Sequence, residues 1–71
     1  MSWELYEVWH NDEGHEELVD TTKSLKEAKQ LAEKTLEELG GEIFILLETR
    51  DGDMDEVERL TIDDNGAIIT L

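Results

Sequence analysis

The 71-residue sequence contains no cysteine and no proline, and it has only six Lys and Arg residues against twenty Asp and Glu. Without cysteine, disulfide frameworks and thiolate metal sites are excluded. No apolar run approaches the ~20 residues of a membrane span, and no basic and apolar signal pattern opens the chain. We therefore expect a cytoplasmic protein with a single domain over residues 1–71, because two cores do not fit in this length.

The formal net charge of -14 narrows the classes of partner. Nucleic acids and anionic membranes are themselves polyanions, so we expect neither as a direct partner. The charge is unevenly distributed, because residues 1–22 and 40–71 carry -7 each while residues 23–39 are neutral. An acidic surface of this kind either keeps the protein soluble or binds a basic partner.

Residues 24–39 carry the clearest periodic pattern. Apolar residues recur at helical spacing from Leu25 to Leu39, and a glycine pair follows as a stop signal. Ser24 is a favourable N-cap, and Glu27 stands at the third position of a capping box. These features predict one amphipathic helix.

The remaining segments read as strands separated by glycine-containing turns. Residues 42–49 include five successive apolar residues, which indicates a central strand buried on both faces. The element order ββαβββ predicts an α+β fold, a five-stranded antiparallel sheet with one helix on one face. Strand order 2-1-3-4-5 centres the two most apolar strands, whereas the antiparallel alternative 2-1-5-4-3 puts one at an edge. The predicted strands are residues 3–10, 15–21, 42–49, 56–62 and 67–71.

Three surfaces are candidates for contact with a partner, either a basic protein surface or a second copy. One helix covers two or three strands of five, so the other sheet face is expected to keep an apolar patch unless long charged side chains cover it. The last strand has no charged side chain and lacks the usual protection of an edge. The candidate residues are Trp3, Tyr6 and Trp9 on the first strand, Asp12, Glu13, Asp63 and Asp64 in turns, and Ile69 and Leu71 on the last strand.

Two groups of residues suggest metal binding without meeting its requirements. His10 and His15 flank the predicted turn 11–14, where a tight hairpin makes them face each other. Asp51, Asp53 and Asp55 begin like a calcium loop, but that pattern then fails at both its glycine and its final glutamate position. Exposed histidines and a solvated acidic turn are the preferred interpretations, and we predict no metal and no cofactor.

The sequence does not match the residue patterns of known kinds of catalytic site. Ser24 is explained as a helix cap, and the approach to the helix, residues 20–23, is not a glycine-rich phosphate loop. Pairs of carboxylates are always available among twenty acids, so they carry no specificity. We therefore expect a binding protein and no enzyme.

Two resemblances rest on the layout of the chain. Tyr6-Glu7-Val8, then Ser24-Leu25-Lys26-Glu27-Ala28-Lys29, then a strand ending in an acidic glycine turn, resembles small bacterial and phage proteins of unknown function. Phage inhibitors of CRISPR complexes are similar in size and layout, which implies an acidic mimic that blocks a nucleic-acid-binding protein. The helix start, the glycine stop and the short turns are also similar to designed α/β proteins, which implies no biological function.

Overall fold

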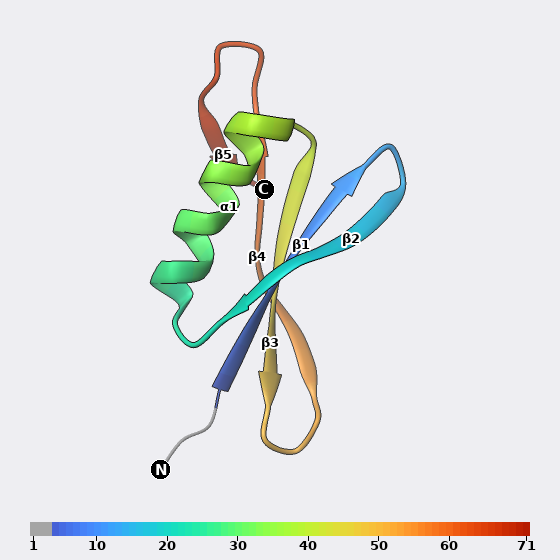
Figure 1. The fold of residues 1–71 in the computed structure, drawn as a ribbon, viewed down its shortest axis with the longest axis vertical. Helices are drawn as coiled ribbons and strands as arrows, with labels where there is room; N and C mark the ends of the chain where they lie inside the picture. Colours follow the sequence, from blue (N-terminus) through green and yellow to red (C-terminus); the bar gives the residue numbers. More distant parts are fainter. Residues whose placement is uncertain (1–3) are drawn as a thin grey trace.

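The structure, a computed structural model, describes residues 4–71. Its five strands form one antiparallel sheet in the order β2-β1-β3-β4-β5, with one helix between β2 and β3 in sequence (Figure 1). The predicted α+β class, element order and strand order are therefore confirmed. The elements are β1 (Glu4–Asp12), β2 (His15–Thr22), α1 (Leu25–Leu39), β3 (Glu42–Thr49), β4 (Met54–Ile62) and β5 (Ile68–Thr70).

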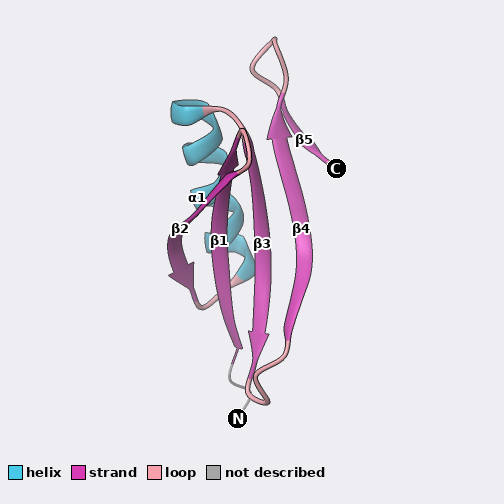
Figure 2. Cartoon of the chain, turned by 90° about the vertical axis from the view of Figure 1, so that its right-hand side faces the viewer, coloured by secondary structure: helices cyan, strands magenta, loops and turns pink. Residues whose placement is uncertain are grey.

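The helix lies on one side of the sheet and leaves the other side uncovered (Figure 2). The Ser24 side chain accepts a hydrogen bond from the backbone N–H of Glu27 at 3.1 Å, as the capping pattern predicts. At the other end, the N–H of Gly40 donates to the carbonyl of Leu36 at 2.8 Å. Among residues 4–71, no helix is long and apolar enough to span a membrane.

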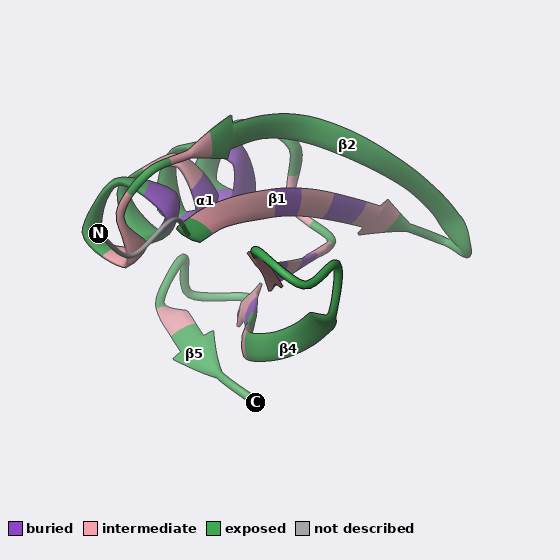
Figure 3. Ribbon diagram, turned by 90° about the horizontal axis from the view of Figure 1, so that it is seen from below, coloured by how far each residue is buried: buried purple, intermediate pink, exposed green. Residues whose placement is uncertain are grey.

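The core lies between α1 and the central strands β1 and β3. Its sheet side is built from residues of alternate positions, which point to the same face of their strands. Purple segments on α1 and β1 mark part of this layer in Figure 3, while β2 is exposed along most of its length. The buried apolar residues are Val8, Ala28, Ala32, Leu36, Ile43, Ile45 and Leu60.

The turn between β1 and β2 is shorter than the predicted turn of residues 11–14. β1 continues to Asp12, and only Glu13 and Gly14 connect the strands. Both have positive φ, 52° and 88°, which is the geometry of a two-residue hairpin turn whose twist matches that of the strands. The side chain of Asn11 accepts a hydrogen bond from the Gly14 N–H at 3.1 Å and supports this turn.

The other two hairpins share a second turn geometry. In each, a backbone N–H before the turn donates to the carbonyl four residues later and closes a three-residue loop ending in glycine: Thr49 to Asp53, and Asp63 to Ala67. The carbonyl of the first residue accepts from the N–H of that glycine, Gly52 or Gly66, at 3.0 Å. Because the first of these loops is so short, β4 begins at Met54, two residues before the predicted start.

Two β-bulges lie at the same level of the sheet. Val19 is the extra residue on β2, and Val57 is the extra residue on β4. Each bulge shifts the pairing by one residue, so that Asp20 lies opposite Val8 and Glu58 lies opposite Ile45. Both valines are therefore left exposed, at 37% and 41%.

Candidate partner-binding face

The uncovered sheet face presents the alternate set of strand residues. On β1, Tyr6, Val8 and His10 point towards the helix side, so Leu5, Glu7 and Trp9 point the other way. On β3, the buried Ile43 and Ile45 similarly leave Phe44 and Leu46 on the uncovered face. We call this surface the open face, as opposed to the helix-covered face.

A row of four side chains crosses the open face over four strands. Pairing places Leu18 of β2 opposite Trp9, Trp9 opposite Phe44, and Phe44 opposite Arg59 of β4. The rings of Trp9 and Phe44 are parallel within 2°, with centroids 6.3 Å apart. Leu18 is 45% exposed and both rings are only half-buried, so the row is an apolar patch open to a partner.

Arg59 closes the row on β4 and is held by three kinds of contact. Its Cζ lies 5.6 Å from the Phe44 centroid, in cation–π geometry. Its Nη2 and Nε donate to Glu56 Oε1 at 2.6 and 3.0 Å, and its Nη1 lies 2.9 Å from Glu42 Oε1. The hydrogen bonds to Glu56 are the largest cause that raises the pKa of Arg59, and the Glu42 carboxylate adds to them.

Carboxylates surround the aromatic row on the open face. Glu42 and Glu48 lie an even number of residues from Phe44 on β3, so they point to the same face. Glu56 of β4 lies opposite Leu46 on this face. Glu7 lies beside Trp9, and its Oε1 accepts a hydrogen bond from the Trp9 Nε1–H at 3.0 Å. These four carboxylates outnumber the single guanidinium of Arg59, so the row has negatively charged surroundings.

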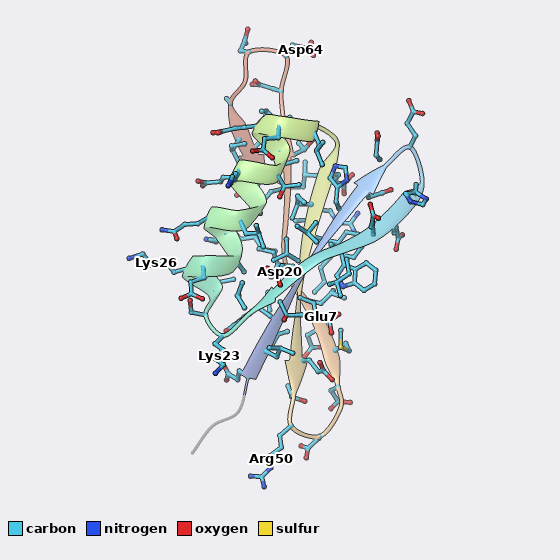
Figure 4. All side chains as sticks on the ribbon, viewed as in Figure 1. Glu7, Asp20, Lys23, Lys26, Arg50 and Asp64 are labelled. Carbon is cyan, nitrogen blue, oxygen red and sulfur yellow. The ribbon has the colours of Figure 1, made fainter. Side chains whose placement is uncertain are left out.

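The charges elsewhere follow the division that the sequence predicts. Figure 4 shows Lys23 and Lys26 beside the first turn of α1, whereas Glu7 and Asp20 lie on the strands and Asp64 at a turn. Lys29 Nζ lies 3.0 Å from Glu58 Oε2, so one helix lysine neutralises a carboxylate on the helix-covered face of β4. The excess of acidic over basic residues therefore lies on the strands and turns.

The aromatic candidates of the first strand do not share one face. Trp9 lies on the open face, between Leu18 and Phe44 in the row. Tyr6 instead packs against the core on the helix side, and its hydroxyl donates to Glu4 Oε2 at 3.3 Å. Burial raises the pKa of Tyr6, and the nearby Glu4 carboxylate raises it further. Trp3 lies outside the described residues.

The acidic turn candidates lie at hairpin tips, away from the aromatic row. Asp12 and Glu13 are exposed at the end of the β1–β2 hairpin, and Asp64 is exposed at the end of the β4–β5 hairpin. Asp63 has a structural role, because its Oδ1 accepts hydrogen bonds from the N–H groups of Asn65 and Ala67 at 2.9 and 2.8 Å. These turns extend the acidic surface to both hairpin tips.

The last strand is an edge strand, as the predicted order requires. β5 pairs only with residues Leu60–Ile62 of β4, and the Leu71 N–H donates to the Arg59 carbonyl at 2.8 Å. Ile69 and Leu71 are exposed at 40% and 64%. Three residues offer a short edge for pairing with another chain.

His10 and His15 do not face each other, contrary to the expected hairpin geometry. The two-residue turn places His10 opposite Glu17 and His15 opposite Asp12. The expectation of two exposed histidines is wrong for His10, which is only 8% exposed because its Nε2 lies 2.9 Å from the Gly40 carbonyl oxygen. Because a carbonyl only accepts, Nε2 carries the proton and the ring ties β1 to the end of the helix.

The acidic residues Asp51, Asp53 and Asp55 lie at the β3–β4 turn and the start of β4. All three are exposed, and the backbone carbonyl of Asp53 accepts the hydrogen bond that closes the loop. Within residues 4–71, no group of three or more His, Asp or Glu side chains is arranged to hold a metal ion.

A groove of about 340 Å³ opens between the second half of α1 and β2. Leu39, which the helical pattern predicts to be buried, lines it and is 64% exposed. The residue is on the correct side of the helix, but β2 does not cover it. The groove is lined by His10, Glu17, Leu18, Val19, Leu31, Lys34, Thr35, Glu38 and Leu39.

The sequence interpretation missed Phe44, Arg59, Glu7 and Glu42 as residues of the open face. The face of Phe44 follows from the sequence pattern once Ile43 and Ile45 are taken as core residues, because Phe44 lies between them and points the opposite way. No such pattern existed for Arg59. Regular pairing from the β3–β4 turn places Glu58 opposite Phe44, and only the bulge at Val57 brings Arg59 there.

Comparisons of the chain with protein-family models, curated proteins and solved structures find no match. The function is therefore inferred from the residues of the open face and their geometry.

Proposed function

We propose that this chain is a binding module for a basic protein surface and that the open face is its binding surface. The observation that carries the proposal is the exposed row of Leu18, Trp9 and Phe44, surrounded by carboxylates. Aromatic residues supply much of the binding energy at protein interfaces, and a charged rim selects the partner.

Charge favours a basic partner over a second copy of the chain. Two copies of net charge -14 repel each other, and the open face itself is negative. A basic surface removes that repulsion and speeds the diffusional encounter. The aromatic row then gives the contact an apolar centre from which water is excluded.

Binding of a short peptide of alternating arginine and serine, measured by calorimetry at about 20 mM salt, tests this proposal. Glu7→Gln with Glu48→Gln removes two charges from the open face, and glutamine still accepts the Trp9 hydrogen bond. The matched control, Glu33→Gln with Glu37→Gln, removes two charges from exposed positions of the helix. The open-face pair is expected to weaken binding by about threefold more than the helix pair.

Equal weakening by the two pairs contradicts the proposal, because binding then depends on net charge alone. No binding of the peptide contradicts it as well. At about 300 mM salt the affinity is expected to fall, since the charged rim is exposed and screened.

A narrower form of the proposal is supported by the charge of the hairpin tips and strands. In this form the partner is a nucleic-acid-binding protein, and the carboxylates occupy the positions of phosphates. Duplex DNA is then expected to compete with the chain for the same basic protein. Simultaneous binding of DNA and the chain to that protein contradicts mimicry while leaving the binding module intact.

A further inference from the structure

The contacts of Arg59 describe a complete binding site for a guanidinium group within the chain itself. The guanidinium carbon Cζ lies over the Phe44 ring, 5.6 Å from its centroid. Its edges meet two carboxylates, Glu56 at 2.6 and 3.0 Å and Glu42 at 2.9 Å. The site thus combines one aromatic ring with carboxylate acceptors, the two kinds of group that a guanidinium binds at once.

The next position along the row has the same two features. The Trp9 ring is parallel to Phe44, and tryptophan is the aromatic side chain that attracts cations best. Glu7 Oε1 accepts the Trp9 Nε1–H, which fixes the ring and keeps the carboxylate beside it. That bond leaves Glu7 Oε2 available to a second donor.

We infer that the Trp9–Glu7 position receives an arginine side chain of the partner, in the way that Phe44, Glu42 and Glu56 receive Arg59. This inference rests on the proposed function and names the side chain that the open face selects. Arginine is favoured over lysine because a planar guanidinium stacks on a ring while its edge binds a carboxylate. A compact, strongly hydrated ammonium does not make both contacts equally well.

The test compares the arginine–serine peptide with its lysine–serine counterpart, which carries the same charge. The unmodified chain is expected to bind the arginine peptide about two- to fivefold more tightly, the range of one exposed cation–π contact. Trp9→Leu keeps an apolar side chain but removes the π face, and it is expected to abolish this preference. Trp9→Phe keeps a ring and is expected to retain part of it.

Arg59→Gln gives a second readout that a purely structural role of the row does not produce. The variant frees Phe44, Glu42 and Glu56 for the partner and also removes one positive charge. The affinity for the arginine peptide is therefore expected to rise by a larger factor than the affinity for the lysine peptide, and equal rises contradict the inference. A thermal melt of each variant first establishes that it is folded, and the melts also separate loss of binding from loss of structure.

The outcomes separate the inference from the proposed function. Equal affinities for the two peptides, or an arginine preference unchanged in Trp9→Leu, overturn the inference while the binding module stands. Failure of both peptides to bind the folded chain overturns the proposed function itself.

Discussion

The two faces of the sheet are formed by alternate residues of the same strands, and they differ in what covers them. On the helix-covered face, Val8 and Ile45 are fully buried against α1. On the open face, the adjacent Trp9 and Leu46 remain only half-buried. Neighbouring residues of a strand point to opposite faces of the sheet and so have different roles. The residues of one face stabilise the fold, and those of the other form an aromatic and acidic surface.

The comparison also extends to the charges. On the helix-covered face, Glu58 is paired with Lys29. On the open face, Arg59 contacts Glu42 and Glu56, while Glu7 contacts no cation in the described part of the chain. The helix thus neutralises one carboxylate on its own side of the sheet, whereas Glu7 on the open face remains available to a partner.

The sharpest test of this difference uses two neighbours on β3. Ile45→Ala removes a side chain with 0% exposure and is expected to lower the free energy of unfolding by about 2–5 kcal/mol. Leu46→Ala, on the open face, is expected to cost about 1 kcal/mol, because this side chain is partly in water already. Urea denaturation measures both, and equal losses contradict the assignment of the two faces.

A second comparison concerns the attachment of the helix end to the helix-covered face. At Gly41, with φ +79°, a Cβ lies 2.8 Å from the Asn11 carbonyl oxygen and 3.0 Å from His10 Nε2. Gly41→Ala is therefore expected to cost about 2–4 kcal/mol, from the backbone conformation and the crowding together. Gly66→Ala has a similar φ, +85°, but open space, and is expected to cost about 1–2 kcal/mol. Thermal melts that rank the two variants equally contradict this role of Gly41.

Salt is expected to affect folding and binding in opposite directions. With a net charge of -14, screening reduces self-repulsion, so raising the salt from about 10 to 300 mM is expected to raise the melting temperature by roughly 4 °C. The same change is expected to weaken binding of a basic peptide by the open face. A melting temperature that falls with salt is evidence against self-repulsion as a destabilising force.

The smallest effect concerns the chain's single tyrosine, which gives a clean titration signal. Its pKa is raised above the ordinary 10.0, so the fold holds this proton more tightly than the unfolded chain does. The resulting stability is present below the unfolded pKa and is lost as the pH rises through the folded pKa. Absorbance near 295 nm is expected to show a higher midpoint for the folded chain than in urea.

Glu4→Gln serves as the control for this titration. It is expected to lower the folded midpoint only part of the way, because burial, which ranks first among the causes of the shift, remains after the Glu4 charge is removed. A midpoint that returns fully to the unfolded value contradicts that ranking.

Much of the fold was accessible from local patterns. The helix limits follow from the Ser24 cap and the glycines after Leu39, and the strand order follows from the apolar run in residues 42–49. These signals succeed because each depends on neighbouring residues or on burial of one segment.

The composition of the open face was harder to predict, because pairing depends on two single-residue bulges. Val19 and Val57 are the bulge residues, but nothing in the neighbouring sequence distinguishes them from valines that point to the core of a regular strand. The bulge at Val57 determines that Arg59 lies against Phe44. The position of His10 depends similarly on the two-residue turn, whose extent was overestimated from its polar residues.

The central claim is that the open face binds a basic partner while the helix-covered face does not. Methyl and indole NMR signals of the unmodified chain, followed during addition of the arginine–serine peptide, test it directly. The account predicts shifts of the Trp9 indole and of the Leu46 methyl groups, with Val8 and Ile45 unchanged. Shifts confined to the groove residues Leu31 and Leu39, or no shifts on the open face, contradict it.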